Sequence, residues 1–175
     1  RPGVVERSGE ASKIKVDISK FFDKTYTLEQ GYVEGGDILR INNHFIIGIS
    51  GRTNETGAKN LSNIIEKNGG TSEIAITPEN TLHFKSECSL LDEETILATD
   101  NLIKSDFFNK KYRIIKVPKG EETGANCLRI NEHLLIPKGY DRLLDLVSKD
   151  YKVRVLDVTE MEKVDAGLSC LSLRW

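Results

Sequence analysis

The chain has 175 residues, of which 38% are hydrophobic and 30% are charged, and its formal net charge is −2. This composition is typical of a globular protein and excludes an intrinsically disordered chain. Because no segment carries a dominant stripe of lysine or arginine and no run of 18 apolar residues occurs, we expect no nucleic-acid partner and no membrane partner.

The first predicted elements lead into a β-hairpin. The N-terminal segment "RPGVVERSGE" predicts a turn followed by a helix. From Gly35 the chain reads "GGDILRINNHFIIGIS", two apolar runs on either side of Asn42-Asn43, which is the pattern of a hairpin. Apolar residues at helical spacing then predict a helix over 54–68, and the strand "SEIAIT" follows it.

The same order of elements recurs twice. "SECSLLDEETILAT" predicts a second hairpin, followed by a helix over 101–109 and the strand "YRIIKVP". "GANCLRINEHLLIPKGY" predicts a third, followed by a helix over 140–149 and the strand "YKVRVLDV". The tetrapeptide Leu-Arg-Ile-Asn begins at Leu39 and again at Leu128, 89 positions later. The sequence therefore predicts an α/β fold of ββαβ modules of about 40 to 50 residues, in a radial or stacked array.

The final stretch resembles the start of a fourth module. "GLSCLSL" aligns with "GANCLRI", which predicts a strand that carries Cys170. Only a turn and a helix precede the first hairpin, so we expect a ring of such modules to be incomplete in this chain. In a ring, Asp37, Cys88, Cys127 and Cys170 would begin strands near the common axis, where propeller-like folds bind ligands.

The three cysteines are widely spaced and no CxxC pair occurs. This pattern disfavours a disulfide framework or a zinc site, and it favours a reducing cytoplasm. On its own, Cys170 is better explained by a buried apolar thiol than by a nucleophile. We interpret Cys88 and Cys127 as structural, since no partner motif accompanies them.

Two further stretches offer polar partners for a reactive thiol. "YVEGGDIL" contains Glu34 and Asp37, and "TLHFKS" contains His83. A cysteine, a histidine and a carboxylate together are typical of nucleophilic catalysis, in which the thiolate attacks and the imidazole moves protons. The alternative is that His83 only ends a strand and that the two acids are turn or cap residues. Asp37 stays open between a pocket role and a backbone role.

Four stretches taken together resemble the dimethylarginine dimethylaminohydrolase family of guanidino-modifying penteins, which are related to arginine deiminases and amidinotransferases. They are "EGGDIL…GISGRTNETGA", "LHFKS", "GANCLRINEHLLIPKGY" and "KVDAGLSCLSLRW". The resemblance extends over residues 1–175 and implies one catalytic domain with the pentein-type α/β propeller fold. It also implies one or two further modules before "RPG", with the acids that hold a guanidinium. We therefore expect a complementing N-terminal segment or a homodimer as a partner.

The resemblance assigns roles to the catalytic candidates. Cys170 resembles the nucleophile, His83 the general acid and base, and Glu34 the carboxylate paired with that histidine. For substrate binding, Arg7 and Arg52 resemble the arginines that hold the α-carboxylate, although Arg52 could instead only lead into a helix.

Two features complete the implied reaction. The backbone carbonyl of Val164 resembles an acceptor for the substrate's α-amino group. The implied activity is hydrolysis of a methylated arginine to citrulline and a methylamine, in the cytoplasm, without a metal or an organic cofactor. The alternatives are an arginine deiminase-like hydrolase that acts on arginine, and a catalytically silent fragment or subunit with the same fold.

Overall fold

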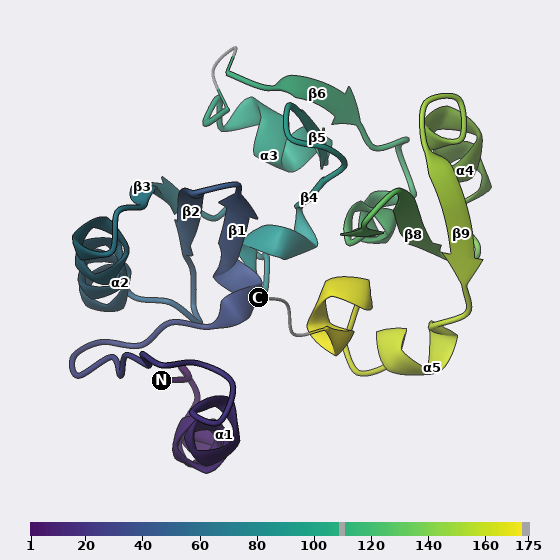
Figure 1. The fold of residues 1–175 in the computed structure, drawn as a ribbon. Coiled ribbons are helices and arrows are strands. Elements are labelled where there is room, and N and C mark those ends of the chain that lie inside the picture. The colour runs from purple at the N-terminus through teal and green to yellow at the C-terminus, as the bar shows by residue number, and fades with distance from the viewer. Residues whose placement is uncertain (109–110, 173–175) are drawn as a thin grey trace. The chain divides into compact units, whose positions relative to one another are not determined.

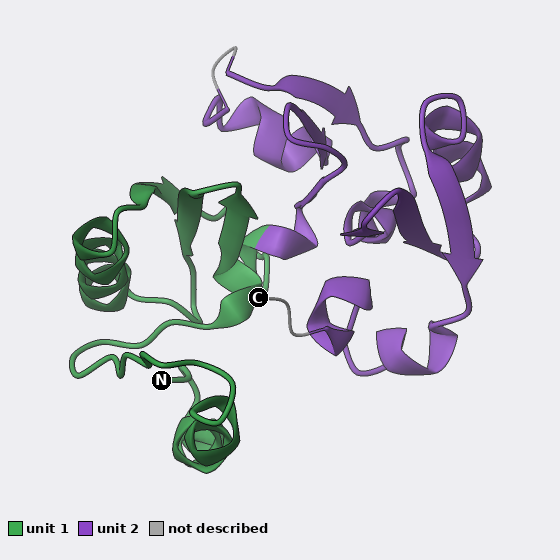
Figure 2. Cartoon of the chain, in the orientation of Figure 1, with its two compact units in different colours: residues 1–84 green, residues 85–175 purple. Residues whose placement is uncertain are grey.

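The computed structural model describes residues 1–108 and 111–172, which form two compact units. The first unit is Arg1–Phe84 and the second is Lys85–Trp175 (Figure 2). The first contains one ββαβ module and the second contains two (Figure 1). The predicted repetition of ββαβ modules is confirmed, whereas the grouping of residues 1–175 into one catalytic domain stays a prediction.

Each module is a three-stranded mixed sheet in which a helix connects the second strand to the third. The first two strands pair antiparallel and the third lies parallel to the second. The strands are β1 (Ile38–Ile41), β2 (His44–Ile49), β3 (Thr71–Ile76), β4 (Cys88–Leu90), β5 (Thr95–Ala98), β6 (Arg113–Lys116), β7 (Leu128–Ile130), β8 (His133–Pro137) and β9 (Lys152–Leu156). The connecting helices are α2 (Glu55–Lys67), α3 (Asp100–Lys104) and α4 (Asp141–Val147).

Two further helices lie outside the modules, namely α1 (Glu10–Ile18) and α5 (Thr159–Glu162). The helix predicted after the N-terminal turn is therefore present. Among the described residues, no helix has the length and apolar character needed to cross a lipid bilayer.

The predicted connecting helices are present, and their ends have local causes. The side chain of Asn54 accepts a hydrogen bond from the Gly57 N–H at 2.9 Å, so Asn54 caps α2. Thr99 caps α3 in the same way, through the Leu102 N–H. The helix α3 ends at Lys104, earlier than the predicted 101–109, and residue 109 lies outside the described residues.

A short 3₁₀ helix precedes the first strand of each module. These helices are Gly35–Asp37, Phe84–Ser86 and Glu122–Ala125, and a fourth, Leu168–Leu171, carries Cys170. The prediction that a strand carries Cys170 is therefore wrong. Its N–H donates to the Gly167 carbonyl at 3.0 Å, the i→i+3 bond of a 3₁₀ turn. The remainder of the predicted strand, residues 173–175, lies outside the described residues.

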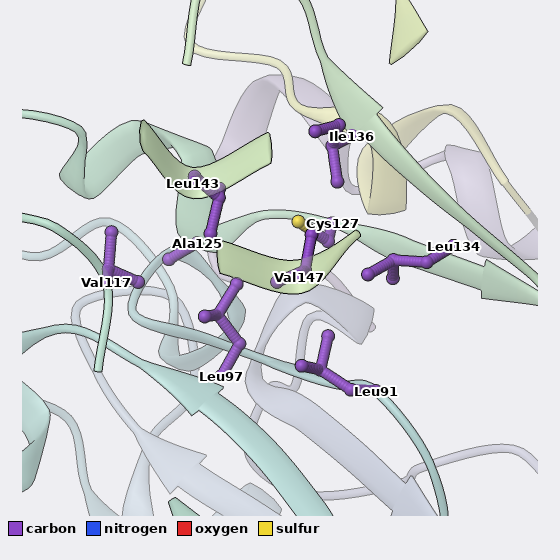
Figure 3. Packing of buried hydrophobic residues seen from close by; sticks show 9 residues of the cluster. All are labelled: Leu91, Leu97, Val117, Ala125, Cys127, Leu134, Ile136, Leu143 and Val147. Carbon is purple, nitrogen blue, oxygen red and sulfur yellow. The ribbon is translucent and has the colours of Figure 1, made fainter. Parts of the chain in front are cut away.

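Each unit has its own apolar core. In the first, Ile47 of β2 packs against Ala58 and Ile65, which lie on one face of α2. In the second, one cluster joins the two modules (Figure 3). Its buried members are Leu91, Leu97, Val117, Ala125, Cys127, Leu134, Ile136, Leu143 and Val147. Cys127 is thus a core residue, as the structural interpretation of this cysteine requires.

Polar side chains also link the start of one module to the next. In the first unit, the Asp37 carboxylate accepts from the Phe84 N–H at 2.8 Å. In the second, the Asn126 side-chain carbonyl accepts from the Ser169 N–H at 2.9 Å. Asp37 and Asn126 are 89 positions apart, the offset of the Leu-Arg-Ile-Asn repeat. Residues at equivalent repeat positions therefore each accept a hydrogen bond from a backbone N–H of a 3₁₀ helix.

Ser89 makes the corresponding link between the two modules of the second unit. Its buried hydroxyl group donates to the Ala125 carbonyl and accepts from the Cys127 N–H at 2.8 Å.

We expect Ser89→Ala to lower the free energy of unfolding by about 1 to 3 kcal/mol, because buried backbone groups would lose their partner. Urea unfolding measures this change. Exposed Ser148→Ala is the control, with a change within about 0.5 kcal/mol, and equal stability of the two variants would contradict the prediction.

Candidate active site

Glu34 is the centre of a polar cluster in the first unit. Glu34 is only 5% exposed, and it directly precedes the 3₁₀ helix Gly35–Asp37. The carboxylate oxygen Oε2 lies 2.9 Å from Nε2 of His83 and 2.9 Å from Nη1 of Arg7. Oε1 accepts from the Gly3 N–H at 3.2 Å and from Nη1 of Arg52 at 3.4 Å. One buried carboxylate thus connects a histidine and two arginines.

These partners decide the protonation of Glu34. Burial alone would raise the pKa of the Glu34 carboxyl, because a buried charge loses hydration. The hydrogen bonds from His83 and Gly3 and the charges of Arg7 and Arg52 outweigh burial, and the pKa of Glu34 lies below its usual range. Glu34 is therefore a carboxylate near neutral pH and accepts hydrogen bonds from all four groups.

Two glycines allow the backbone to approach the cluster. A Cβ atom on Gly36 would lie 2.5 Å from Cγ of His83. A Cβ atom on Gly3 would lie 2.7 Å from the Arg52 backbone oxygen. Because only glycine lacks this atom, the imidazole ring packs directly on the Gly36 backbone. The ring is therefore confined between that backbone and the Glu34 carboxylate.

Arg7 has a second carboxylate partner. Its Nε and Nη2 atoms bond the two oxygens of Glu10 at 2.9 and 2.8 Å, a fork that suits a planar guanidinium. The hydrogen bond with Glu10 is the largest of the effects that together raise the pKa of Arg7. Glu10 was not among the residues predicted from the sequence, although "RSGE" places an acid three residues after an arginine at the start of a predicted helix.

Asp37 holds two hydroxyl groups and one backbone N–H of the first unit. It is fully buried and accepts from the hydroxyl groups of Ser50 and Thr53 at 2.8 and 2.7 Å, besides the Phe84 N–H. Thr53 in turn accepts from the Glu34 N–H at 3.1 Å. This arrangement favours the backbone role of Asp37, which holds the segment that carries Glu34.

Cys170 lies in the second unit and differs from the other two cysteines. Cys170 is exposed, whereas Cys88 and Cys127 are buried. Burial raises the pKa of both buried thiols well above the usual value, so they stay protonated. The side-chain nitrogen Nδ2 of Asn126 lies 4.0 Å from Sγ of Cys170. Asn126 was not among the residues predicted from the sequence, although it lies at the repeat offset of 89 positions from Asp37.

Val164 also lies in the second unit, in the turn that ends α5. The Ala166 N–H bonds the Met161 carbonyl at 3.0 Å, and Asp165 adopts a φ of 57°, which are features of a helix C-terminus with a left-handed residue. The structure thus brings together Glu34, His83, Arg7, Arg52 and Asp37. Cys170 and Val164 belong instead to the second unit.

Comparison with known proteins identifies relatives over the whole chain. The family model for arginine deiminase matches residues 13–135. N(G),N(G)-dimethylarginine dimethylaminohydrolase of Pseudomonas aeruginosa is 35% identical over 178 residues, which cover 100% of this chain and 69% of that protein. The Streptomyces coelicolor protein of the same name is 28% identical, over 99% of this chain and 67% of its own length.

The solved structures agree with the sequence comparison. The structure of the Pseudomonas aeruginosa enzyme, a cysteine-to-serine variant in complex with citrulline, matches 100% of this chain with a TM-score of 0.94. The match covers 69% of that chain. The three ββαβ modules described above therefore have the α/β pentein fold. On the identity and coverage of these matches, the chain belongs to the dimethylarginine dimethylaminohydrolase family of the pentein, or amidinotransferase, superfamily.

Proposed function

We propose that the chain is the thiol hydrolase part of an enzyme that converts an Nω-methylated arginine to citrulline and a methylamine. The observation that carries the proposal is the 2.9 Å contact between His83 and the buried Glu34 carboxylate. A histidine with one ring nitrogen held by a carboxylate has a fixed orientation, and its other nitrogen, Nδ1, is the one to exchange protons with a substrate. Membership in the family and the citrulline bound to a relative support the same reaction.

In the first half of the reaction, the Cys170 thiolate attacks the electron-poor guanidinium carbon and forms a C–S bond. The tetrahedral adduct collapses when the C–N bond to the methylated nitrogen breaks. Protonated His83 donates its proton to that nitrogen, and the methylamine leaves. The product on the enzyme is an S-alkylthiouronium. A cationic substrate beside the sulfur favours the thiolate form that attacks.

In the second half, a water molecule replaces the sulfur. Neutral His83 accepts one proton from the water as the water attacks the same carbon. The C–S bond then breaks, the remaining hydroxyl proton passes to solvent, and citrulline and the thiolate are released. Glu34 stabilises the imidazolium that forms when His83 is protonated, because the carboxylate stays ionised beside it. The mechanism requires His83 and Cys170 to reach one carbon atom, so in this proposal residues 1–175 form one catalytic domain.

Substrate binding in this proposal uses Arg7, Arg52 and the Val164 backbone carbonyl. A guanidinium bonds both oxygens of a carboxylate in a fork. On Arg7 this fork is taken by Glu10, so a substrate carboxylate would replace Glu10 there. Val164 is 72% exposed, which leaves its segment accessible to a substrate amine. Asp37 acts indirectly, through the backbone that carries Glu34.

A second candidate is an arginine deiminase-like hydrolase, which the match of the arginine deiminase family model favours. The two reactions share the attack on the guanidinium carbon and differ in the leaving group, which is ammonia for arginine and a methylamine for a methylated arginine. In both, the substrate is a small guanidino compound. We place the reaction in the cytoplasm, because three widely spaced free cysteines favour a reducing compartment.

The test combines selective labelling with product analysis. The purified chain is treated with 2-chloroacetamidine, a guanidinium-like thiol reagent, and the intact mass is measured for the wild type and for Cys170→Ser. We expect one label on the wild type and none on the variant, because Cys88 and Cys127 are buried. Citrulline, methylamine and ammonia are then measured with arginine and with Nω-methylated arginines. A wild type that takes up no label selectively at Cys170 would overturn the proposed nucleophile, and faster release of ammonia from arginine would favour the second candidate.

A further inference from the structure

We propose that Asn126 is a positioning residue for Cys170, which holds the turn that carries the thiol and presents an amide donor to the thiolate. This inference rests on the proposed function, in which Cys170 is the nucleophile. Both residues lie in the second unit. The proposal comes from the contacts of a single side-chain amide, whose two ends face different groups of the same 3₁₀ helix.

The oxygen end of the amide holds the turn. Asn126 Oδ1 accepts from the Ser169 N–H at 2.9 Å. Ser169 lies in the 3₁₀ helix Leu168–Leu171 and directly precedes Cys170. The N–H groups at the start of a short helix have no partner within it, so this bond fixes the backbone beside the cysteine.

The nitrogen end of the amide faces the sulfur. Asn126 Nδ2 lies 4.0 Å from Sγ of Cys170, and it is a donor. A Cβ atom on Gly167 would come within 2.5 Å of Nδ2 and of the side-chain carbon Cγ. The absence of a side chain at Gly167 therefore leaves room for the amide. An N–H group aimed at a sulfur atom stabilises the charged thiolate more than the neutral thiol.

The internal repeat explains why the residue is asparagine. At the equivalent position of the first module, Asp37 accepts three hydrogen bonds, from Ser50, Thr53 and Phe84, and donates none. A carboxylate suits that site because every partner is a donor. In the third module one partner is a donor, the Ser169 N–H, and the other is a sulfur that reacts as an anion. Of a carboxylate and an amide, only the amide offers both an acceptor to the Ser169 N–H and a donor to the sulfur.

The experiment compares Asn126→Asp with Asn126→Ala. The aspartate variant retains an acceptor for the Ser169 N–H but puts a negative charge beside the sulfur. We expect alkylation of Cys170 by iodoacetamide at neutral pH to slow by about tenfold in the aspartate variant, from charge repulsion at this distance. The alanine variant, which loses both the acceptor for the Ser169 N–H and the donor to the sulfur but adds no charge, is expected to slow by about threefold. Mass mapping of the labelled peptides assigns the label to Cys170.

Which of the two variants has the slower alkylation of Cys170 decides between the proposal and a purely structural role of Asn126. If Asn126 held the turn and its nitrogen end did not face the sulfur, a charge placed there would have no effect: Asn126→Asp would react like the wild type, and Asn126→Ala would be the more damaged variant. That result would overturn the inference while leaving Cys170 as the nucleophile, whereas an unreactive wild type would overturn both. Asn131→Asp, an exposed turn residue of the same hairpin, adds the same charge as a control and should react like the wild type.

A spectroscopic measurement keeps the test independent of folding of the aspartate variant. The ultraviolet absorbance of the thiolate is compared between the wild type and Asn126→Ala at neutral pH, with Cys170→Ser as the blank. We expect a smaller thiolate fraction in Asn126→Ala. An unchanged thiolate fraction in a folded alanine variant would overturn the inference, because removing a donor that stabilises the thiolate must lower that fraction.

Discussion

Replacing Glu34 by glutamine is expected to lower the rate of citrulline formation by about 10² to 10⁴-fold, the usual contribution of general acid and base catalysis. Glutamine keeps the size of the side chain but removes its charge. The His83 imidazolium would then lose the carboxylate that lies 2.9 Å away. Steady-state rates with an Nω-methylated arginine measure the effect, and the main loss should appear in kcat.

The same substitution has an effect on stability that needs no turnover. Glu34 accepts from His83, Gly3, Arg7 and Arg52 in a site where its side chain is 5% exposed. An amide pairs with these cationic groups less strongly, so we expect a loss of about 1 to 3 kcal/mol in the free energy of unfolding at neutral pH. Glu10→Gln is the matched control, because Glu10 binds Arg7 at the exposed surface. Exposed ion pairs contribute about 0 to 1 kcal/mol.

The pH dependence of the free energy of unfolding shows whether the ionised Glu34 carboxylate stabilises or destabilises the fold. The pKa of Glu34 in the folded chain lies below its usual range, which is about 4.3 in an unfolded chain. A carboxyl group with a lowered folded pKa stabilises the fold fully above the unfolded pKa and loses that contribution as the pH falls through the folded pKa. The stability advantage of the wild type over Glu34→Gln should therefore shrink on acidification below about pH 4. A difference that grows on acidification would contradict the assignment.

Much of the fold was predictable from sequence because its signals are local and are repeated. Alternation of apolar runs around Asn42 predicted a hairpin, and the structure places Asn42 at a φ of 53° in that turn, a conformation that asparagine tolerates. Asn131 has the same φ in the third module. Asn54 before an amphipathic stretch predicted where α2 begins. Each of these features depends on residues only a few positions apart.

The position of Cys170 shows where a local pattern fails. "GLSCLSL" matches the apolar pattern of "GANCLRI", yet the structure has a 3₁₀ helix at Leu168–Leu171. Leu168 is buried with Leu128 and Val158, and Ser169 is held by Asn126 from 43 positions away. The turn is therefore fixed by tertiary contacts that no window of the sequence contains. An apolar pattern alone did not distinguish this turn from a strand.

The candidate site was predictable as a set of residues but not as a network of contacts. The resemblance assigned Glu34 to His83, and it assigned Arg7 and Arg52 to a substrate. Both arginines in fact contact Glu34, at 2.9 and 3.4 Å. These contacts depend on how segments from three parts of the first unit pack together. The sequence pattern therefore predicted which charged residues belong to the site. Only the packing of the first unit shows that Arg7 and Arg52 pair with Glu34.

Gly36→Ala is expected to reduce citrulline formation by about 10²-fold or more, although Gly36 carries no reactive group. A Cβ atom there would lie 2.5, 2.7 and 2.9 Å from Cγ, Cδ2 and Nδ1 of His83. These atoms belong to the rigid ring, so the whole imidazole must move away. A displacement of about 1 Å at a catalytic group costs roughly 10²-fold in rate. Steady-state kinetics and the NMR chemical shifts of the His83 ring measure the loss of activity and the displacement separately.

Gly35→Ala is the matched control for this prediction. The two glycines are neighbours, neither has a positive φ, and a Cβ atom on Gly35 would meet nothing within 4 Å. Backbone stiffening by alanine is therefore common to both variants, whereas the clash with the imidazole is present only at Gly36. We expect Gly35→Ala to keep the wild-type His83 chemical shifts and activity, with a stability change within about 0.5 kcal/mol. Equal losses in the two variants would show that backbone freedom, and not the position of the His83 ring, limits the reaction.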